Sequence, residues 1–343
     1  MFISGFYLTQ SGSFIVNGTL NLSTALLTQT QLFTINGTAN ISGPYTFGAN
    51  GGFSGTGTVN VTSSTSTFNA GSALTTKLNV TGGTLNDNVG LLPGEVTLGA
   101  FGAYGGTGSP TFANGFNWNG GSVQGSGTVL VSGTMAVNNS SSLSGDKQIH
   151  LSGTGTVNSG VFLSFSGTAK FIVLSTGVIT FDGASNATVN GGMNNLFEIQ
   201  SGGALIKNGT NNYSLQLPFS ENGGSITVNG GTLTFGTNTQ SFTNGTVAIN
   251  GSTSLILNSS TATMTGTAVS GTGTLRLEVS TLHVNVGTTI TSKIHIYSGT
   301  LNDNVGLQPG EETLGSAGQG YYAGTGSPPF ANGIVWNLGD IQG

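Results

Sequence analysis

Four carboxylates occupy equivalent positions in two nearly identical segments of the chain: Asp87 and Glu95 in the first, and Asp303 and Glu311 in the second. Asn86 and Asn88 flank Asp87, so this stretch is rich in the carboxylate and amide oxygens that bind Ca²⁺. The four carboxylates are therefore candidate calcium ligands. The alternative is a tight turn, because Asn and Asp side chains readily form hydrogen bonds with their own backbone.

Catalysis on polysaccharides would need two or three carboxylates that converge on one face of the fold. The chain has only 11 acidic residues, and an active site would have to be assembled from a few of them, namely Asp87, Glu95, Glu198 and Glu221. Gly-x-Gly patterns are inevitable with 60 glycines, and none of them opens a helical segment that could bind a phosphate. We therefore assign no catalytic or cofactor-binding residues, and we expect a protein that is not an enzyme and needs no cofactor.

Two further groups of side chains could bind ligands. His283 and His295 would form a metal site only if the fold brings them together, and exposed strand positions are the simpler interpretation. The largest aromatic side chains could form a platform for sugar rings or could fill the core; they are Tyr104, Phe116, Trp118, Tyr321, Tyr322 and Trp336. We expect these aromatic residues to belong to the core.

Charged residues are scarce, which bounds the partners of the protein. They make up only 5 % of the 343 residues, and the net charge is −5. The six basic residues are scattered singly, whereas a nucleic-acid interface needs a clustered basic face. The longest apolar stretches, such as Phe171–Leu174, are far shorter than the roughly 20 residues of a membrane-spanning helix. We expect neither a nucleic-acid partner nor a membrane span.

The chain contains a long internal repeat. Gly83–Gly99 and Gly299–Gly315 differ at only two positions and lie 216 residues apart. Further on, Trp118 corresponds to Trp336, so the second copy has gained two residues, which we place in Gly318–Tyr322. The repeat predicts that residues 1–125 are a partial copy of a unit of about 216 residues. Residues 126–343 are then a second, complete copy that continues directly from the first.

A shorter repeat runs inside the long one. Thr19–Leu22, Thr38–Ile41 and Thr58–Val61 alternate apolar and polar residues as β-strands do, and they start 19 and 20 residues apart. A coil of this length cannot bury its apolar face alone, so it must stack on its neighbours. The sequence predicts an all-β, single-stranded parallel β-helix with coils of about 20 residues and ladders of stacked Asn and Thr. The alternative fold is a series of tandem β-sandwich domains.

The style of the repeat resembles that of a known group of proteins. Trp118–Val129 has the sequence WNGGSVQGSGTV, its beginning returns in part from Trp336, and Gly-Thr-hydrophobic segments run along the whole chain. In these features the chain resembles the repeat regions of large bacterial surface adhesins of the autotransporter and filamentous-haemagglutinin type. The resemblance implies a parallel β-helix that projects from the cell, binds surfaces or hosts, or assembles into fibres.

These observations predict an extracellular or cell-surface fibre protein with a structural or adhesive role. Its main partner would be itself, end to end in filaments or within a longer array, and surface glycans or host surfaces would be further partners. Met1–Gly5 resembles Val129–Gly133, which follows the point in the first copy that matches Gly343, as head-to-tail stacking would require. The alternatives are a polysaccharide-degrading β-helix enzyme and an ice-binding solenoid. Ice binding would need a regular threonine array, and Thr-x-Thr motifs do not recur at constant spacing.

Overall fold

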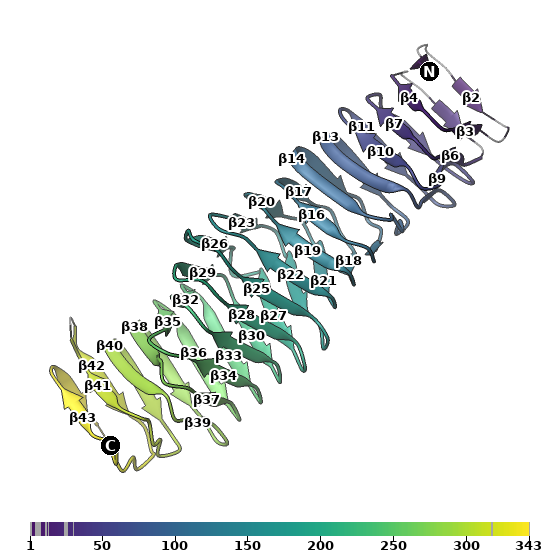
Figure 1. Cartoon of the computed structure of the whole chain (residues 1–343). Helices are drawn as coiled ribbons and strands as arrows, with labels where there is room; N and C mark the ends of the chain where they lie inside the picture. Colours follow the sequence, from purple (N-terminus) through teal and green to yellow (C-terminus); the bar gives the residue numbers. More distant parts are fainter. Residues whose placement is uncertain are drawn as a thin grey trace. The chain divides into compact units, whose positions relative to one another are not determined.

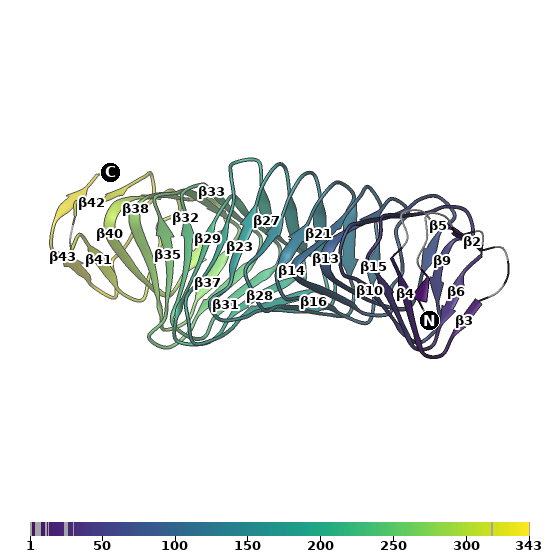
Figure 2. The ribbon, with the colours of Figure 1, turned by 90° about the horizontal axis from the view of Figure 1, so that it is seen from above.

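A computed structural model of the chain describes residues 2–3, 8–10, 12, 14–23, 27–29, 31–316 and 318–342. These residues form strands, turns and bends without any helix. Contacts divide the chain into two compact units, which are Met1–Gly155 with Leu163–Lys170 and Thr156–Phe162 with Phe171–Gly343. Each unit is a stack of coils in which a strand pairs with the equivalent strands of the coils before and after it (Figures 1 and 2).

The strands of the first unit form three rows along the stack. The first row is β1 (Phe2–Ile3), β4 (Thr19–Leu22), β7 (Thr38–Ile41), β10 (Thr58–Val61), β13 (Lys77–Asp87), β14 (Val96–Gly105), β16 (Phe116–Trp118) and β19 (Thr134–Val137). The second row is β8 (Tyr45–Phe47), β11 (Thr65–Phe68), the later parts of β13 and β14, β17 (Gly121–Val123) and β20 (Ser141–Leu143). The third row comprises β3 (Phe14–Val16), β6 (Phe33–Ile35), β9 (Gly52–Ser54) and β12 (Ala73–Leu74), and then β15 (Thr111–Phe112), β18 (Thr128–Val131) and β21 (Gln148–Leu151). A separate pair is β2 (Leu8–Gln10) with β5 (Leu27–Gln29).

The second unit repeats this plan. Its first row is β25 (Val178–Phe181), β28 (Ala204–Lys207), β31 (Ser225–Val228), β34 (Thr246–Ile249), β37 (Ala268–Ser270) and β39 (Thr289–Ile290). Its second row is β26 (Ala187–Asn190), β29 (Asn212–Gln216), β32 (Thr232–Gly236), β35 (Ser254–Asn258), β38 (Thr274–Val284), β40 (Lys293–Asp303), β41 (Glu312–Leu314) and β43 (Ile334–Trp336). Its third row is β27 (Leu196–Gln200), β30 (Phe219–Asn222), β33 (Thr239–Thr243), β36 (Thr261–Thr265), the later parts of β38 and β40, β42 (Gly320–Ala323) and β44 (Gly339–Ile341). The strands β22 (Thr154–Val157), β23 (Phe162–Phe165) and β24 (Lys170–Val173) each include residues of both units.

The pairing confirms the predicted parallel β-helix with coils about 20 residues apart. The registers found within both units are parallel, as for β10 with β7 and β33 with β36. A β-sandwich would pair its strands antiparallel, so the alternative of tandem sandwiches is wrong. Coil length varies between 19 and 26 residues because the loops at the corners differ, while the strands stay in register.

Alternation along each strand builds the core and the surface together. In β10, Val59 and Val61 are buried, whereas Thr58 and Asn60 point outward. The outward amides form the predicted asparagine ladder, with successive Nδ2–Oδ1 distances of 2.7, 2.8 and 2.9 Å; its members are Asn21, Asn40, Asn60 and Asn79. Each ladder bond joins neighbouring coils, so a surface side chain adds to the backbone pairing.

The two copies of the long repeat fold alike where their sequences match. β13 and β40 have the same length and the same ending, Gly-Thr-Leu-Asn-Asp. The first copy continues with the single strand β14, whereas the second copy has two strands, β41 and β42, in its place. The two extra residues therefore lie between Leu314 and Gly320, which overlaps the predicted segment Gly318–Tyr322. The boundaries at residues 125 and 126 remain a prediction from the repeat.

Candidate functional site

Asp87 ends β13 and is fully buried below the turn that follows it. One carboxylate oxygen accepts hydrogen bonds from the backbone N–H groups of Val89 at 2.9 Å and Gly90 at 2.7 Å. The other oxygen accepts the N–H of Leu91 at 2.9 Å and the hydroxyl of Tyr104 at 2.8 Å. Four donors thus surround the carboxylate, and they hold the corner of the coil.

Asp303 has the same environment in the second copy. Its carboxylate accepts the N–H groups of Val305, Gly306 and Leu307 at 2.8 Å each, and the hydroxyl of Tyr322 at 2.5 Å. Burial, reinforced by the neighbouring aspartate, raises the pKa of both tyrosines well above the ordinary value, so the hydroxyls stay protonated donors. The observed contacts are those of a turn, the alternative to calcium that the sequence offered.

Glu95 and Glu311 do not join these aspartates but pair with lysines. Glu95 lies 3.4 Å from Lys77, and Glu311 lies 3.0 Å from Lys293. Both pairs are partly exposed, and pairs of this kind contribute about 0–1 kcal/mol. Among the described residues, no group of three or more His, Asp or Glu side chains is placed to hold a metal ion. The calcium site therefore stays a prediction without a structural argument in its favour.

The carboxylates of the catalytic hypothesis that lie in the second unit point in different directions. Glu198 lies in β27 and Glu221 in the adjacent strand β30, but Glu198 is on the surface and Glu221 is fully buried. Burial raises the pKa of Glu221 to about 7, although backbone N–H donors, chiefly that of Gly224 at 2.6 Å, act in the opposite direction. These two groups do not face a common substrate.

The histidines are likewise separated. His283 bonds to Asn302 of the next coil at 3.1 Å, whereas His295 is paired in register with Arg276, seven positions before His283 along β38. The fold therefore does not bring the two imidazoles together. Desolvation, together with the charge of Arg276, lowers the pKa of His295, so this ring is less readily protonated than a free histidine.

The aromatic residues of the first copy are core residues, as predicted. Trp118, Phe116 and Tyr104 are buried, and the rings of Phe116 and Trp118 stack at 5.6 Å. Trp336 differs from its counterpart Trp118, since it is 56 % exposed. The contrast arises because β16 is covered by β19, where Val137 lies next to Trp118.

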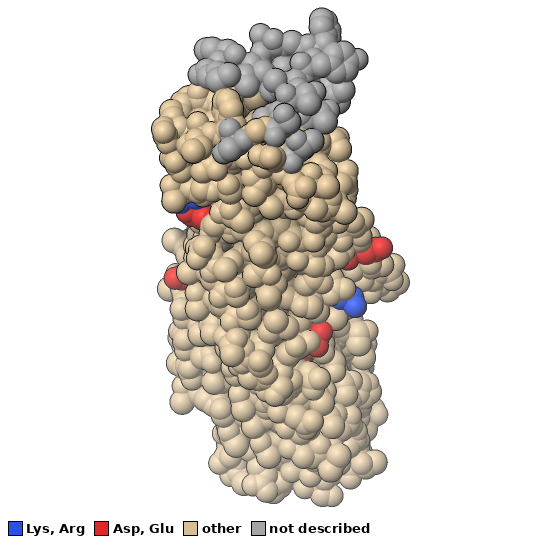
Figure 3. Space-filling model, turned by 90° about the vertical axis from the view of Figure 1, so that its right-hand side faces the viewer, with Lys and Arg blue, Asp and Glu red and all other residues tan. Residues whose placement is uncertain are grey.

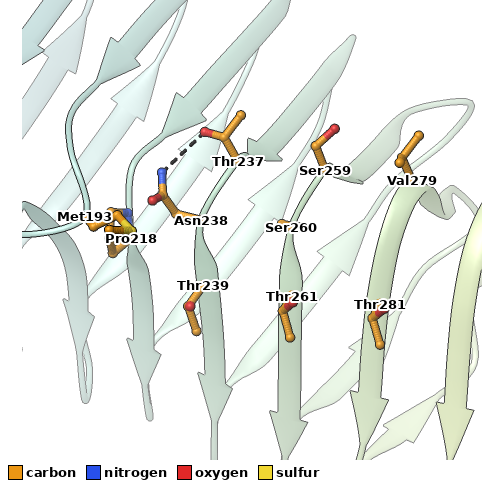
Figure 4. A pocket seen from close by; sticks show the side chains of 10 residues that line it. All are labelled: Met193, Pro218, Thr237, Asn238, Thr239, Ser259, Ser260, Thr261, Val279 and Thr281. Atoms are coloured by element: carbon orange, nitrogen blue, oxygen red, sulfur yellow. Dashed lines mark hydrogen bonds between the residues drawn. The ribbon is translucent and has the colours of Figure 1, made fainter.

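The most distinct surface feature of the second unit is a groove of about 700 Å³ on its third row of strands (Figure 4). Its lining residues are Met193, Pro218, Thr237, Asn238, Thr239, Ser259, Ser260, Thr261, Val279 and Thr281. None of these ten side chains titrates near neutral pH, so the lining offers no general acid or base. The groove can supply hydroxyl, amide and methyl contacts to a ligand.

The sequence analysis missed the threonine row in this groove. Thr239, Thr261, Thr281 and Thr300 are successive register partners in β33, β36, β38 and β40. The expectation that threonines do not recur once per coil is therefore wrong at this place. The row is hidden in the sequence because corner loops change the coil length, and only strand register shows the alignment.

Comparison of the chain with known protein families, with curated proteins and with solved structures gave no match. The described residues contain no helix that is long and apolar enough to cross a membrane. Charged side chains are isolated on the face shown in Figure 3, as the composition predicts. Functional inference therefore rests on the coils and their surfaces.

Proposed function

We propose that the protein is a structural or adhesive element of an extracellular fibre, and that its coils associate end to end with a second copy of the chain. The observation that carries this proposal is the exposed apolar surface of β43 and β44. Trp336 is 56 % exposed and Ile341 is 39 % exposed, whereas their counterparts Trp118 and Val123 are fully buried.

The first copy shows what covers this surface. β16 and β17 lie between coils, because β14 precedes them and β19 and β20 follow them. β43 and β44 pair with the preceding strands β41 and β42 in the same way. A coil of the same repeat would therefore fit β43 and β44 by continuing the parallel register. Of Met1–Gly5, which the sequence suggests as such a coil, the structure describes only β1.

The chemistry of the exposed strands favours association. Val335, Trp336, Leu338 and Ile341 are all exposed large apolar side chains, and they lie within eight residues of one another. Burying one such side chain contributes about 1.5–3 kcal/mol, so covering the group would outweigh a modest cost of ordering. An exposed strand edge also templates pairing with another strand.

The extracellular and adhesive parts of the proposal rest on composition. The chain has six lysine and arginine residues in 343, so trypsin-like proteases find few cleavage sites. Asparagine ladders and low charge suit a fibre that holds together through repeated contacts between coils. Surface glycans and host surfaces are the partners proposed for the adhesive role.

Sedimentation velocity over a range of concentrations tests the association. Trp336→Lys places a charge on the end surface, and we expect it to weaken self-association at least about 10-fold, given the burial energy of one large apolar side chain. Phe101→Lys is the matched control, because Phe101 is 87 % exposed and lies on β14, away from the coil end. Equal association of both variants and the parent protein would contradict the proposal, and so would a strictly monomeric parent.

A further inference from the structure

The groove on the third row of the second unit has a regular floor. Thr239, Thr261 and Thr281 stand side by side on neighbouring strands, and their side chains point the same way (Figure 4). Parallel strands are ~4.8 Å apart, so the groove presents one hydroxyl at this interval along the stack. This interval is close to the length of one ring in an extended β-linked polysaccharide.

The rim of the groove is regular as well. Thr237, Ser259 and Val279 each begin the turn before a floor strand, and all three adopt left-handed backbone conformations, with φ of 60°, 51° and 52°. This conformation is unfavourable for residues other than glycine, and most of all for the β-branched Val279. The same strained backbone in three successive coils keeps the rim aligned with the floor, as functional sites often do.

Apolar contacts complete the lining. Met193 and Val279 are highly exposed, and both line the groove with Pro218. Methyl and thioether groups beside a row of hydroxyls match a sugar ring, which has apolar C–H faces and polar edges. The volume of about 700 Å³ is within the range of ligand sites, roughly 300–1,000 Å³.

The charge of the lining selects the kind of sugar. All ten lining residues are uncharged, and the amide of Asn238 donates to the hydroxyl of Thr237 at 3.3 Å. Hydroxyls and amides bind other hydroxyls well, but they do not neutralise an anionic chain. We propose that this groove binds a neutral polysaccharide chain that runs along the stack, with successive sugar units over Thr239, Thr261 and Thr281.

This binding site is independent of end-to-end association, because it lies on the side of the coils and does not include Trp336. Its test uses the full chain and electrophoresis in gels that contain xyloglucan, glucomannan, dextran or the anionic polygalacturonate. The groove variant carries Thr239→Val, Thr261→Val and Thr281→Val, which keep shape and β-branching but remove three hydroxyls. The control variant carries Thr232→Val, Ser254→Val and Thr274→Val, an equivalent register row on the second row of strands.

The expected result is retardation by at least one neutral polysaccharide, at least 10-fold weaker binding by the groove variant, and unchanged binding by the control variant. Circular dichroism melting of both variants confirms that the fold is retained. Failure of every neutral polysaccharide to retard the protein would overturn the proposal, as would equal losses in both variants. Retardation by polygalacturonate alone would also overturn it. Thermal hysteresis in freezing solutions, lost only in the groove variant, would assign the threonine row to ice instead.

Discussion

Glu312 is a buried carboxyl group at a position where the first copy has an apolar residue. Its counterpart is Val96, and its register neighbours in the adjacent coils are Ile294 and Ile334. Glu312 is fully buried, and within the described part of the chain neither carboxylate oxygen has a hydrogen-bond partner. Replacing it by the residue of the first copy, Glu312→Val, should therefore stabilise the coils around β41.

The size and pH dependence of this effect follow from the pKa. Burial, and secondarily the charge of Asp303, raises the pKa of Glu312 from 4.5 to about 7. The folded protein then binds a proton that the unfolded chain releases between pH 4.5 and 7, so stability is greatest below pH 4.5 and falls as the pH rises. The loss is about 1.4 kcal/mol per pH unit and about 3 kcal/mol in total, and it is complete above pH 7. Glu312→Val removes this pH-dependent loss.

Hydrogen–deuterium exchange measures the effect where it occurs, because the coils of a solenoid open locally. Protection factors, which correct for the intrinsic pH dependence of exchange, would be compared at pH 4 and pH 8 for Glu312–Tyr322. The segment Val96–Gly105 serves as an internal reference. We expect Glu312→Val to increase protection by about 3 kcal/mol more at pH 8 than at pH 4, limited by the stability of the whole unit.

Glu311→Val is the matched control, because Glu311 is exposed and forms only a surface pair with Lys293. Its effect should be within about 1 kcal/mol at either pH. The reasoning is refuted if Glu312→Val gives the same change in protection at both pH values, or if it lowers protection at pH 8.

Three other changes probe the buried polar groups. Asp87→Ala leaves three backbone N–H groups and the Tyr104 hydroxyl without their acceptor, so urea unfolding should show a loss of about 3–5 kcal/mol; a loss below 1 kcal/mol would contradict this role. Calcium should leave the melting temperature of the parent protein unchanged, and a rise that Asp87→Ala abolishes would instead support the calcium site. Gly245→Ala would put a Cβ 1.9 Å from the Glu221 carboxylate and should lower stability by about 2 kcal/mol or more in thermal melts, whereas Gly251→Ala tests an open position that also has positive φ.

The coil and its alternation could be predicted from sequence because they are local properties. Thr58–Val61 shows in four residues which side chains are buried, and the spacing from Thr38 gives the coil length. The ladder through Asn60 followed from the same spacing, since equivalent positions of stacked coils must meet. Turn formation at Asp87 was also within reach, because Asp beside Asn favours backbone bonding.

Other features depend on contacts that the sequence does not show. Trp118 and Trp336 are the same residue type in matching contexts, yet one is buried and the other exposed, because the difference lies in the coil that follows. The row through Thr261 was missed because loop lengths vary from coil to coil. The burial of Glu312 could have been found by aligning it with Val96, whose strand position is apolar in the first copy.

Cryo-electron microscopy of the concentrated protein tests the central claim, that chains of stacked coils continue into one another. The account predicts filaments in which the ~4.8 Å strand spacing runs through each junction and a coil of the next chain covers Trp336. Single particles at every concentration, or filaments that leave Trp336 exposed and join through the sides of the coils, would contradict it.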